Sequence, residues 1–181
     1  MFIISLMKRI VIIGTSCSGK TTLAKTIALK LGIKHIELDE LNWKPNWIER
    51  ETDDFRSLVV EEIKEDNWVA DGNYSVLRDV LWSRSTTIIW LNYSFPKVLY
   101  RSISRSFKRS LTKEVIFSEN TESFKKSFFS RESIILWVIK THRSKQKKYS
   151  EVLYNGSISE KNIIELKSQS ETNRYISSLE S

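Results

Sequence analysis

The chain has one cysteine, two histidines and no apolar run long enough to cross a membrane. A single Cys17 excludes an intramolecular disulfide and fits a reducing cytoplasm. Two histidines without a Cys/His cluster disfavour a structural zinc site. A membrane helix needs roughly 18 apolar residues, whereas the longest run here is Ile134–Ile139. The apolar N-terminus precedes Lys8 and Arg9, which is the reverse of a secretory signal; Met7 is a second candidate start. We therefore expect a cytoplasmic protein without a membrane segment.

Apolar residues make up 40% of the 181 residues and charged residues 28%, which indicates a folded globular chain. Its length fits one domain, residues 1–181. The net charge of +7 is unevenly distributed, because residues 97–148 carry 14 Lys and Arg against 4 Asp and Glu. This segment has a local net charge of +10, so the remainder sums to −3. A polyanion would meet the chain there, which keeps nucleic acid open as a partner. The oligomeric state stays undecided.

Short apolar runs alternate with amphipathic segments along most of the chain. The runs predict strands over 8–14, 34–39, 68–71, 86–91 and 162–166, and the amphipathic segments predict helices over 21–31, 52–65, 96–111 and 171–179. Strands that alternate with helices build an α/β fold, here a five-stranded parallel sheet with helices on both faces. Residues 112–150 lack a strand pattern and predict a helical, lid-like insertion before the last strand.

The strongest motif is Gly14-Thr15-Ser16-Cys17-Ser18-Gly19-Lys20-Thr21, a G-x-x-x-x-G-K-[ST] loop between a strand and a helix. Its glycines let successive N–H groups point inward, and the following helix adds its positive N-terminus. The motif predicts ATP with Mg²⁺, with Lys20 on the β- and γ-phosphates and Thr21 on the metal. The predicted phosphate-binding residues are Gly14, Thr15, Ser16, Cys17, Ser18, Gly19, Lys20, Thr21 and Thr22. Cys17 has two interpretations, an oxidisable thiol near a helix N-terminus or a small residue whose backbone binds the phosphate.

Two aspartates stand at predicted carboxyl ends of strands, where parallel sheets bind ligands. Asp71 is a candidate metal ligand together with Thr21, and Asp39 is a candidate for orienting or deprotonating the acceptor. Both have a simpler interpretation as helix-capping or turn residues. Glu40 is a weaker candidate of the same kind.

These motifs together resemble the adenylate-kinase-like P-loop kinases, and within them the bacterial group labelled DNA topology modulation protein or adenylate kinase by similarity. The resemblance covers about residues 8–150 and is carried by 14–22, 36–43, 71–74, 78–79, 101–109 and 130–143. It implies a nucleoside-monophosphate-kinase core, an acceptor-binding segment at about 39–66 and a lid at about 105–148. Adenylate kinases carry Asp-Gly-Phe-Pro-Arg where this chain has Asp71-Gly72-Asn73-Tyr74-Ser75, with no arginine before Arg78. That departure weighs against AMP as the acceptor.

Arginines recur every four residues at Arg101, Arg105 and Arg109, so they share one face of the predicted helix. Leu99, Ile103 and Phe107 are nearly opposite, and we expect the helix to bury that apolar side. The resemblance implies that arginines of this helix contact the nucleotide. Arg101 and Arg105 are therefore candidate nucleotide ligands, and Arg105, Arg131 and Arg143 candidate catalytic residues that neutralise the transferring phosphoryl group. Each also has a simpler interpretation as a solvated surface charge.

Two features bear on the acceptor. Trp43 and Trp47 suit a stacked base, or else belong to the core at the sheet edge. The basic run 140–148 suits a helix C-terminus, or a nucleic-acid backbone.

The sequence predicts an ATP- and Mg²⁺-dependent kinase of a nucleotide or nucleoside-like small molecule. Its catalytic residues would be Lys20, Asp39, Asp71, Arg105, Arg131 and Arg143. A polynucleotide or tRNA kinase, a nucleotide-gated DNA-binding protein without enzymatic activity, and a shikimate- or gluconate-type kinase remain alternatives.

Overall fold

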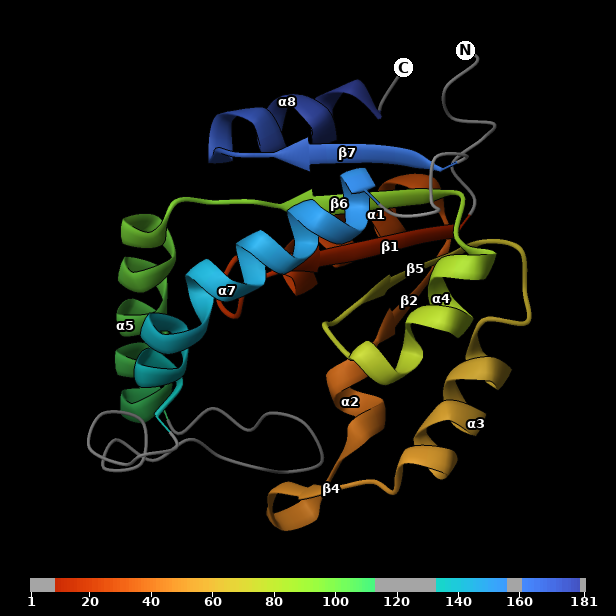
Figure 1. Cartoon of the computed structure of the whole chain (residues 1–181), viewed down its shortest axis with the longest axis horizontal. Helices are drawn as coiled ribbons and strands as arrows, with labels where there is room; N and C mark the ends of the chain where they lie inside the picture. Colours follow the sequence, from red (N-terminus) through yellow and green to blue (C-terminus); the bar gives the residue numbers. More distant parts are fainter. Residues whose placement is uncertain (1–8, 113–132, 156–160, 180–181) are drawn as a thin grey trace.

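A computed structural model of the chain describes residues 9–112, 133–155 and 161–179. Five parallel strands form the central sheet in the order β2-β5-β1-β6-β7 (Figure 1). They are β1 (Arg9–Gly14), β2 (Lys34–Glu37), β5 (Trp68–Asp71), β6 (Thr87–Leu91) and β7 (Asn162–Leu166). The registers Ile12↔Asp71 and Gly14↔Leu91 bring the carboxyl ends of β5, β1 and β6 to one edge. The predicted five-stranded parallel sheet is confirmed.

Both faces of the sheet are buried at its central strand β1, which explains why this strand is apolar from Ile10 to Ile13. In β1, Val11 and Ile13 face one hydrophobic cluster, whereas Ile10 and Ile12 face the other. All four are at most 2% exposed. Alternate residues of a strand point to opposite faces, so one β-branched run supplies both halves of the core.

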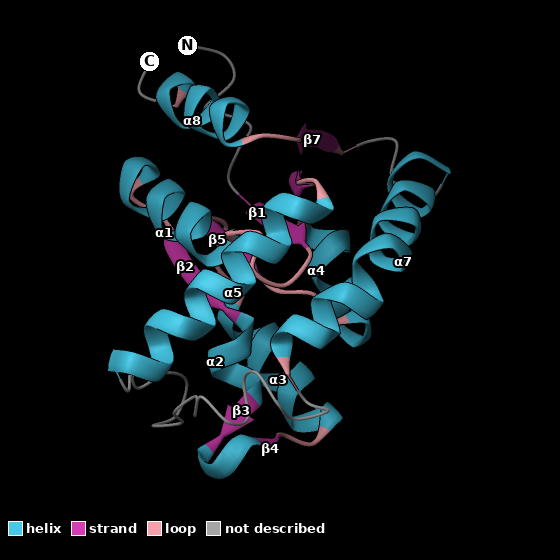
Figure 2. Cartoon of the chain, turned by 90° about the vertical axis from the view of Figure 1, so that its left-hand side faces the viewer, coloured by secondary structure: helices cyan, strands magenta, loops and turns pink. Residues whose placement is uncertain are grey.

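Helices cover the two faces separately. Side chains of three helices pack into the cluster that contains Val11 and Ile13: α3 (Thr52–Glu62), α4 (Arg78–Arg84) and the C-terminal part of α7 (Ile134–Asn155). Side chains of α1 (Lys20–Leu31), α8 (Gln169–Ser178) and the start of α5 (Phe95–Thr112) pack into the cluster that contains Ile10 and Ile12. Figure 2 shows α1 on one side of the strands and α4 and α7 on the other. The predicted covering of both faces is therefore confirmed.

The segment after β2 differs from the prediction. Strand β2 ends at Glu37 rather than Asp39, because Leu38–Asn42 folds into the short helix α2 with Asp39 in its first turn. A small hairpin follows, formed by β3 (Trp43–Lys44) and β4 (Ile48–Glu49) around the turn Pro45–Trp47. Helix α3 ends at Glu62, three residues earlier than predicted, where Ile63 caps it.

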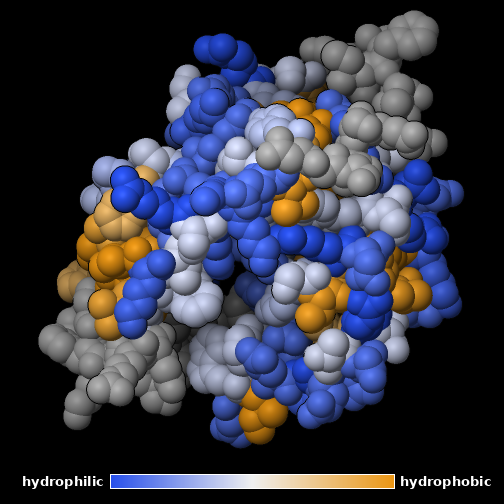
Figure 3. Space-filling view, viewed as in Figure 1, coloured by the Kyte–Doolittle hydropathy of each residue, from blue (hydrophilic) through white to orange (hydrophobic). Residues whose placement is uncertain are grey.

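The orientation expected for α5 is wrong. Its buried residues are Val98, Ser102 and Ser106, all 0% exposed, whereas Ile103 and Phe107 are 43% and 53% exposed. Figure 3 shows the resulting apolar patch on the outer surface of α5. Small hydroxyl residues, and not the large apolar ones, face the protein, because the helix packs closely against the phosphate loop and α7. The arginines consequently lie beside the buried face.

The lid-like segment is only partly described, since 113–132 lie outside the described residues. Its described part is the 22-residue helix α7, which packs along α5 and then crosses the sheet. The helices described in the structure include none with the length and apolarity required to span a bilayer.

Candidate functional site

The loop between β1 and α1 has the backbone of an anion-binding site. Gly19, the residue before the helix, has φ 98°, and Cys17 has φ 62°, a conformation uncommon outside glycine. Helix α1 has no acidic residue in its first turn, so its positive N-terminus is not neutralised there. Thr15 and Ser18 are buried, Ser16 is half-buried and Thr22 is exposed. The predicted phosphate loop thus adopts the curled form that the motif requires.

Asn73 fixes the start of this loop. Its side chain accepts a hydrogen bond from Gly14 N (3.3 Å) and donates one to Gly14 O. A Cβ added at Gly14 would lie 2.7 Å from Ser18 Oγ and 2.8 Å from Leu91 O, so a side chain there would displace the loop. Asn73 therefore has a structural role that the sequence comparison with Asp-Gly-Phe-Pro-Arg did not reveal.

Lys20 extends back over the loop and donates to Thr15 O at 3.2 Å. Burial lowers the pKa of Lys20, and the carboxylates of Asp39 and Asp71 oppose that effect. The structure therefore brings together three of the predicted residues around one ammonium group. Figure 3 shows the surface hollowed at this end of the sheet, between α5, α7 and α2.

Asp71 is 3% exposed and binds partners through both carboxylate oxygens. Thr21 Oγ1 donates to Oδ2 at 2.7 Å, and His35 Nε2 donates to Oδ1 at 2.7 Å. A buried carboxylate is unfavourable without such donors. The predicted Thr21–Asp71 pair is in contact, and His35 is a third member that the sequence analysis missed. Its spacing from Asp71 gave no local signal, because the contact depends on the pairing of β2 with β5.

Asp39 lies on α2 and accepts a hydrogen bond from Tyr74 OH at 2.7 Å. Burial, with the adjacent Asp39 charge, raises the pKa of Tyr74 well above its ordinary value, so this phenol stays protonated and donates. Trp43 and Trp47 pack edge to face in the nearby hairpin, with ring centroids 5.5 Å apart. Neither belongs to the core clusters, so the interpretation of both as core aromatics is wrong. Trp47 has φ 57°, an unusual conformation for a bulky residue.

Arg101 holds the phosphate loop from outside. Its Nη1 donates to Ser18 O at 2.6 Å, Nη2 donates to Gln169, and the guanidinium lies 4.7 Å from the ring centre of Tyr93. Arg101 therefore links α5, the loop and the start of α8. The structure places Arg101 beside the phosphate loop, where it supports the loop's backbone, and its contact with the nucleotide stays a prediction.

The remaining predicted cations differ in their positions. Arg105 is half-buried, and its charge acts on Lys20, lowering that pKa. Its Nε is buried with no hydrogen-bond partner in the described part of the chain. Arg143 lies on the exposed side of α7, and Arg109 is half-buried further along α5. Arg131 lies outside the described residues.

Lys145 of α7 is a cation of the site that the sequence analysis treated only as part of a basic run. Burial, reinforced by the charge of Lys20, lowers the pKa of Lys145 to about 8, and Asp39 opposes this. Its ammonium lies 5.2 Å from the ring centre of Trp137. No periodicity separates Lys145 from Lys147 and Lys148, which are exposed. Only the seating of α7 distinguishes them.

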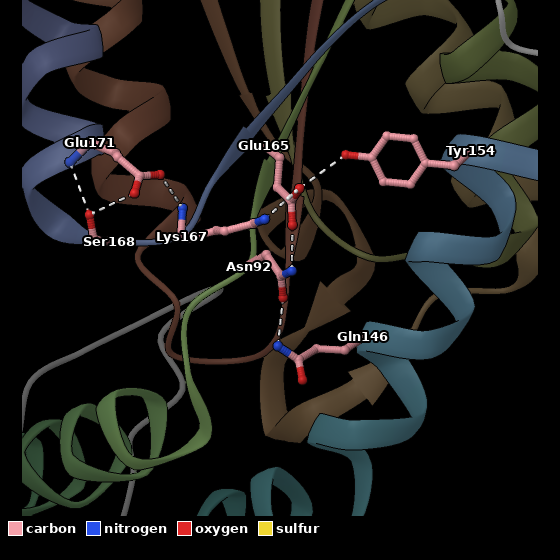
Figure 4. A network of polar contacts seen from close by, with 7 residues as sticks. All are labelled: Asn92, Gln146, Tyr154, Glu165, Lys167, Ser168 and Glu171. Atoms are coloured by element: carbon pink, nitrogen blue, oxygen red, sulfur yellow. Dashed lines mark hydrogen bonds and ion pairs between the residues drawn. The ribbon is translucent and has the colours of Figure 1, made fainter.

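A polar network seats α7 on the sheet (Figure 4). Gln146 Nε2 donates to Asn92 Oδ1 at 2.5 Å, and Asn92 Nδ2 donates to Glu165 Oε1 at 2.6 Å. Tyr154 OH donates to the other oxygen of Glu165 at 3.0 Å. One turn earlier, His142 Nε2 donates to Tyr93 O at 3.0 Å. These bonds fix the helix on both sides of Lys145.

The donor set suits a hard cation that keeps most of its water. Thr21 and Asp71 offer a hydroxyl and a carboxylate, the oxygen ligands that Mg²⁺ prefers. Across 9–112, 133–155 and 161–179, His, Cys, Asp and Glu side chains form no cluster of three that could hold a metal by themselves. One or two protein oxygens beside substrate phosphates is the usual arrangement for Mg²⁺, so the residues present fit it.

No family model matches the chain, and none of the curated proteins matches it in sequence. Solved structures do match. A shikimate kinase from Acinetobacter baumannii, in complex with shikimate, is 15% identical with a TM-score of 0.59, over 96% of this chain and 90% of that one. A shikimate kinase from Bacteroides thetaiotaomicron is 16% identical with a TM-score of 0.52, over 95% and 96%. A sugar kinase from a Janibacter species, unliganded, is 14% identical with a TM-score of 0.51, over 96% and 90%. The chain is thus similar in fold, over nearly its whole length, to these kinases: it has a five-stranded parallel sheet with helices, in the P-loop fold of the nucleoside-monophosphate-kinase type.

Proposed function

We propose that this protein is a P-loop kinase that transfers the γ-phosphoryl group of ATP to a small-molecule acceptor. The observation that carries the proposal is the convergence of Lys20, Asp71 and Asp39 at the mouth of the phosphate loop. A protein that only bound nucleotide would need the loop and the metal pair. It would not need a second, acceptor-side carboxylate such as Asp39, held by Tyr74.

The residues divide the work as follows. The loop's N–H groups and Lys20 hold the phosphates, and Arg105 and Lys145 add positive charge where negative charge develops during transfer. Thr21 and Asp71 would hold Mg²⁺, which when bound neutralises phosphate charge. Where the acceptor group is a hydroxyl, its oxygen forms a bond to the γ-phosphorus, the bond from that phosphorus to the β–γ bridging oxygen breaks, and the hydroxyl proton passes to Asp39.

The acceptor is, in our proposal, a nucleotide or nucleoside-like molecule bound beside α2 and the β3–β4 hairpin. Trp43 and Trp47 favour a flat group, because both rings lie in this hairpin, next to α2, and aromatic rings stack on flat groups. The shikimate-bound neighbour shows that the same fold accepts a small acid, so a hydroxy acid is the competing class within the same reaction. The cytoplasm is the expected location.

A polynucleotide kinase is a second candidate. It is favoured by the outer side of α7, where Lys140, Arg143, Lys147 and Lys148 are all exposed. Phosphate contacts by such residues would make affinity for RNA or DNA fall steeply with salt.

One assay separates these functions. Purified protein is incubated with γ-labelled ATP, Mg²⁺ and a panel of nucleoside monophosphates, nucleosides, hydroxy acids and 5′-hydroxyl oligonucleotides. Lys20→Ala serves as the inactive variant, and Lys30→Ala on the same helix is the matched control. We expect label on a monomeric acceptor, lost only in Lys20→Ala. Label on the oligonucleotide alone establishes the second candidate. ATP binding without any transfer refutes both and supports a nucleotide-gated binding protein.

A further inference from the structure

His35 is a partly buried histidine with no place in the proposed transfer chemistry. It lies on β2, one of the two edge strands of the sheet, and its side chain is 16% exposed. Its register partner on β5 is Val69, whereas Glu37 is opposite Asp71. The His35 side chain therefore reaches diagonally to Asp71, a residue 36 positions later in the sequence.

The contact uses the carboxylate oxygen that Thr21 does not use. His35 Nε2 lies 2.7 Å from Oδ1 of Asp71, and Thr21 Oγ1 lies 2.7 Å from Oδ2. A carboxylate only accepts hydrogen bonds when ionised, so Nε2 carries the proton. With one donor on each oxygen, the carboxylate plane of Asp71 cannot rotate about its Cβ–Cγ bond without breaking both bonds.

The other acidic side chain on this side of β2 has a partner of its own. His35 and Glu37 lie on the same face of β2, the face that α1 covers, because alternate strand residues share a face. Glu37 is paired instead with Lys25 of α1, at 3.4 Å. The strands and α1 thus bring together two adjacent pairs, His35 with Asp71 and Lys25 with Glu37. Burial and the charge of Asp71 raise the pKa of Glu37, and Lys25 and His35 oppose that effect.

We propose that His35 is a positioning residue for the magnesium–nucleotide complex. By holding Oδ1 it keeps Oδ2 of Asp71 directed at Thr21, and so preserves the oxygen pair that would meet the metal. Partners that hydrogen-bond a metal-binding carboxylate typically change metal affinity by about 10- to 100-fold when removed. The inference rests on the metal role given to Thr21 and Asp71 in the proposed function.

The test compares two substitutions that differ in one property. His35→Leu keeps the bulk but has no donor, whereas His35→Gln places an amide N–H the same number of bonds from Cα as Nε2. Lys34→Ala, on the same strand, is the control, since it removes only a surface pair with Glu62. Affinity for ADP is measured by calorimetry with and without Mg²⁺, and Mn²⁺ binding to the ADP complex by electron paramagnetic resonance.

We expect His35→Leu to bind metal-free ADP within about twofold of the wild type, while its metal-dependent gain in affinity falls by about tenfold. His35→Gln should recover most of that gain, and Lys34→Ala should retain all of it. An unchanged metal dependence in His35→Leu overturns the proposal. Equal losses with and without metal in both His35 variants also overturn it, because they show a merely structural role.

The two proposals fail separately. Phosphoryl transfer by the wild type together with unchanged metal dependence in His35→Leu refutes the role of His35 and leaves the kinase standing. The converse pair of results is a wild type that transfers phosphate to no acceptor and a His35→Leu variant that loses the metal-dependent gain in ADP affinity. That pair refutes the kinase and leaves the role of His35 standing.

Discussion

Replacing Lys145 by methionine should stabilise the folded protein while impairing phosphoryl transfer. The ammonium of Lys145 is partly removed from water and lies near the like charge of Lys20, which lowers its pKa from 10.5 to about 8. Methionine keeps the apolar stem and carries no charge. A residue that is unfavourable for the unliganded fold but suited to a phosphate is a typical compromise between stability and function.

The size of the effect follows from that shift. A change of about 2.5 pKa units at 1.36 kcal/mol per unit corresponds to a cost of about 3 kcal/mol. Methionine also loses the contact with Trp137, worth about 1 kcal/mol. The net gain is about 2 kcal/mol at pH 7, which for a chain of this length raises Tm by about 4–8 °C.

The sign of the pH dependence is fixed by the lowered pKa. Between about pH 8 and 10.5 the unfolded chain binds more protons than the folded one, so the wild type gains stability as pH rises. The cost of Lys145 is complete below about pH 8 and is small by about pH 10. The advantage of Lys145→Met should therefore shrink to about zero at pH 10.

Calorimetry of both proteins at pH 7 and pH 10 measures this difference, and activity assays at pH 7 should show transfer reduced by at least about tenfold. Lys147→Met is the matched control, because Lys147 is exposed and forms a weak surface pair with Glu151 at 3.9 Å; its effect should stay within about 0.5 kcal/mol. A Lys145→Met protein that is less stable at pH 7, or whose advantage is the same at both pH values, refutes the reasoning.

Three further results are expected. Arg101→Lys keeps the charge but loses the forked contact with Ser18 O and Gln169, so its affinity for metal-free ADP, measured by calorimetry, should fall by about 10- to 100-fold. Unchanged affinity would show that Arg101 does not support the loop. Tyr74→Phe removes the hydrogen-bond donor to Asp39, so kcat should fall about tenfold while the Kd for the nucleotide stays constant. A change confined to that Kd would instead show that Tyr74 contacts the nucleotide. In urea unfolding, Phe107→Ser should change the free energy of unfolding by less than about 0.5 kcal/mol, whereas Val98→Ala should lower it by about 2 kcal/mol. A larger loss in Phe107→Ser than in Val98→Ala would contradict the observed orientation of α5.

Local sequence was sufficient to predict the strands of the sheet and the phosphate loop. The β-branched run of β1, the glycines and Lys20 lie within one stretch, and each signal depends on neighbours only a few residues away. Strand and helix periodicity, and the steric freedom of Gly14 and Gly19, act at that range. The candidates Asp39 and Asp71 followed from the rule that parallel sheets bind ligands at strand ends.

The partners of those residues were decided by tertiary structure. His35 reaches Asp71 because β2 pairs with β5, and Lys145 reaches the site because Gln146 and His142 seat α7 against the end of β6. The same holds for α5, whose periodicity gave two faces but not which of them is buried. Side-chain pattern defines the faces of an element, whereas close packing against distant segments chooses among them, and that choice placed the serines of α5 inward and its large apolar side chains outward.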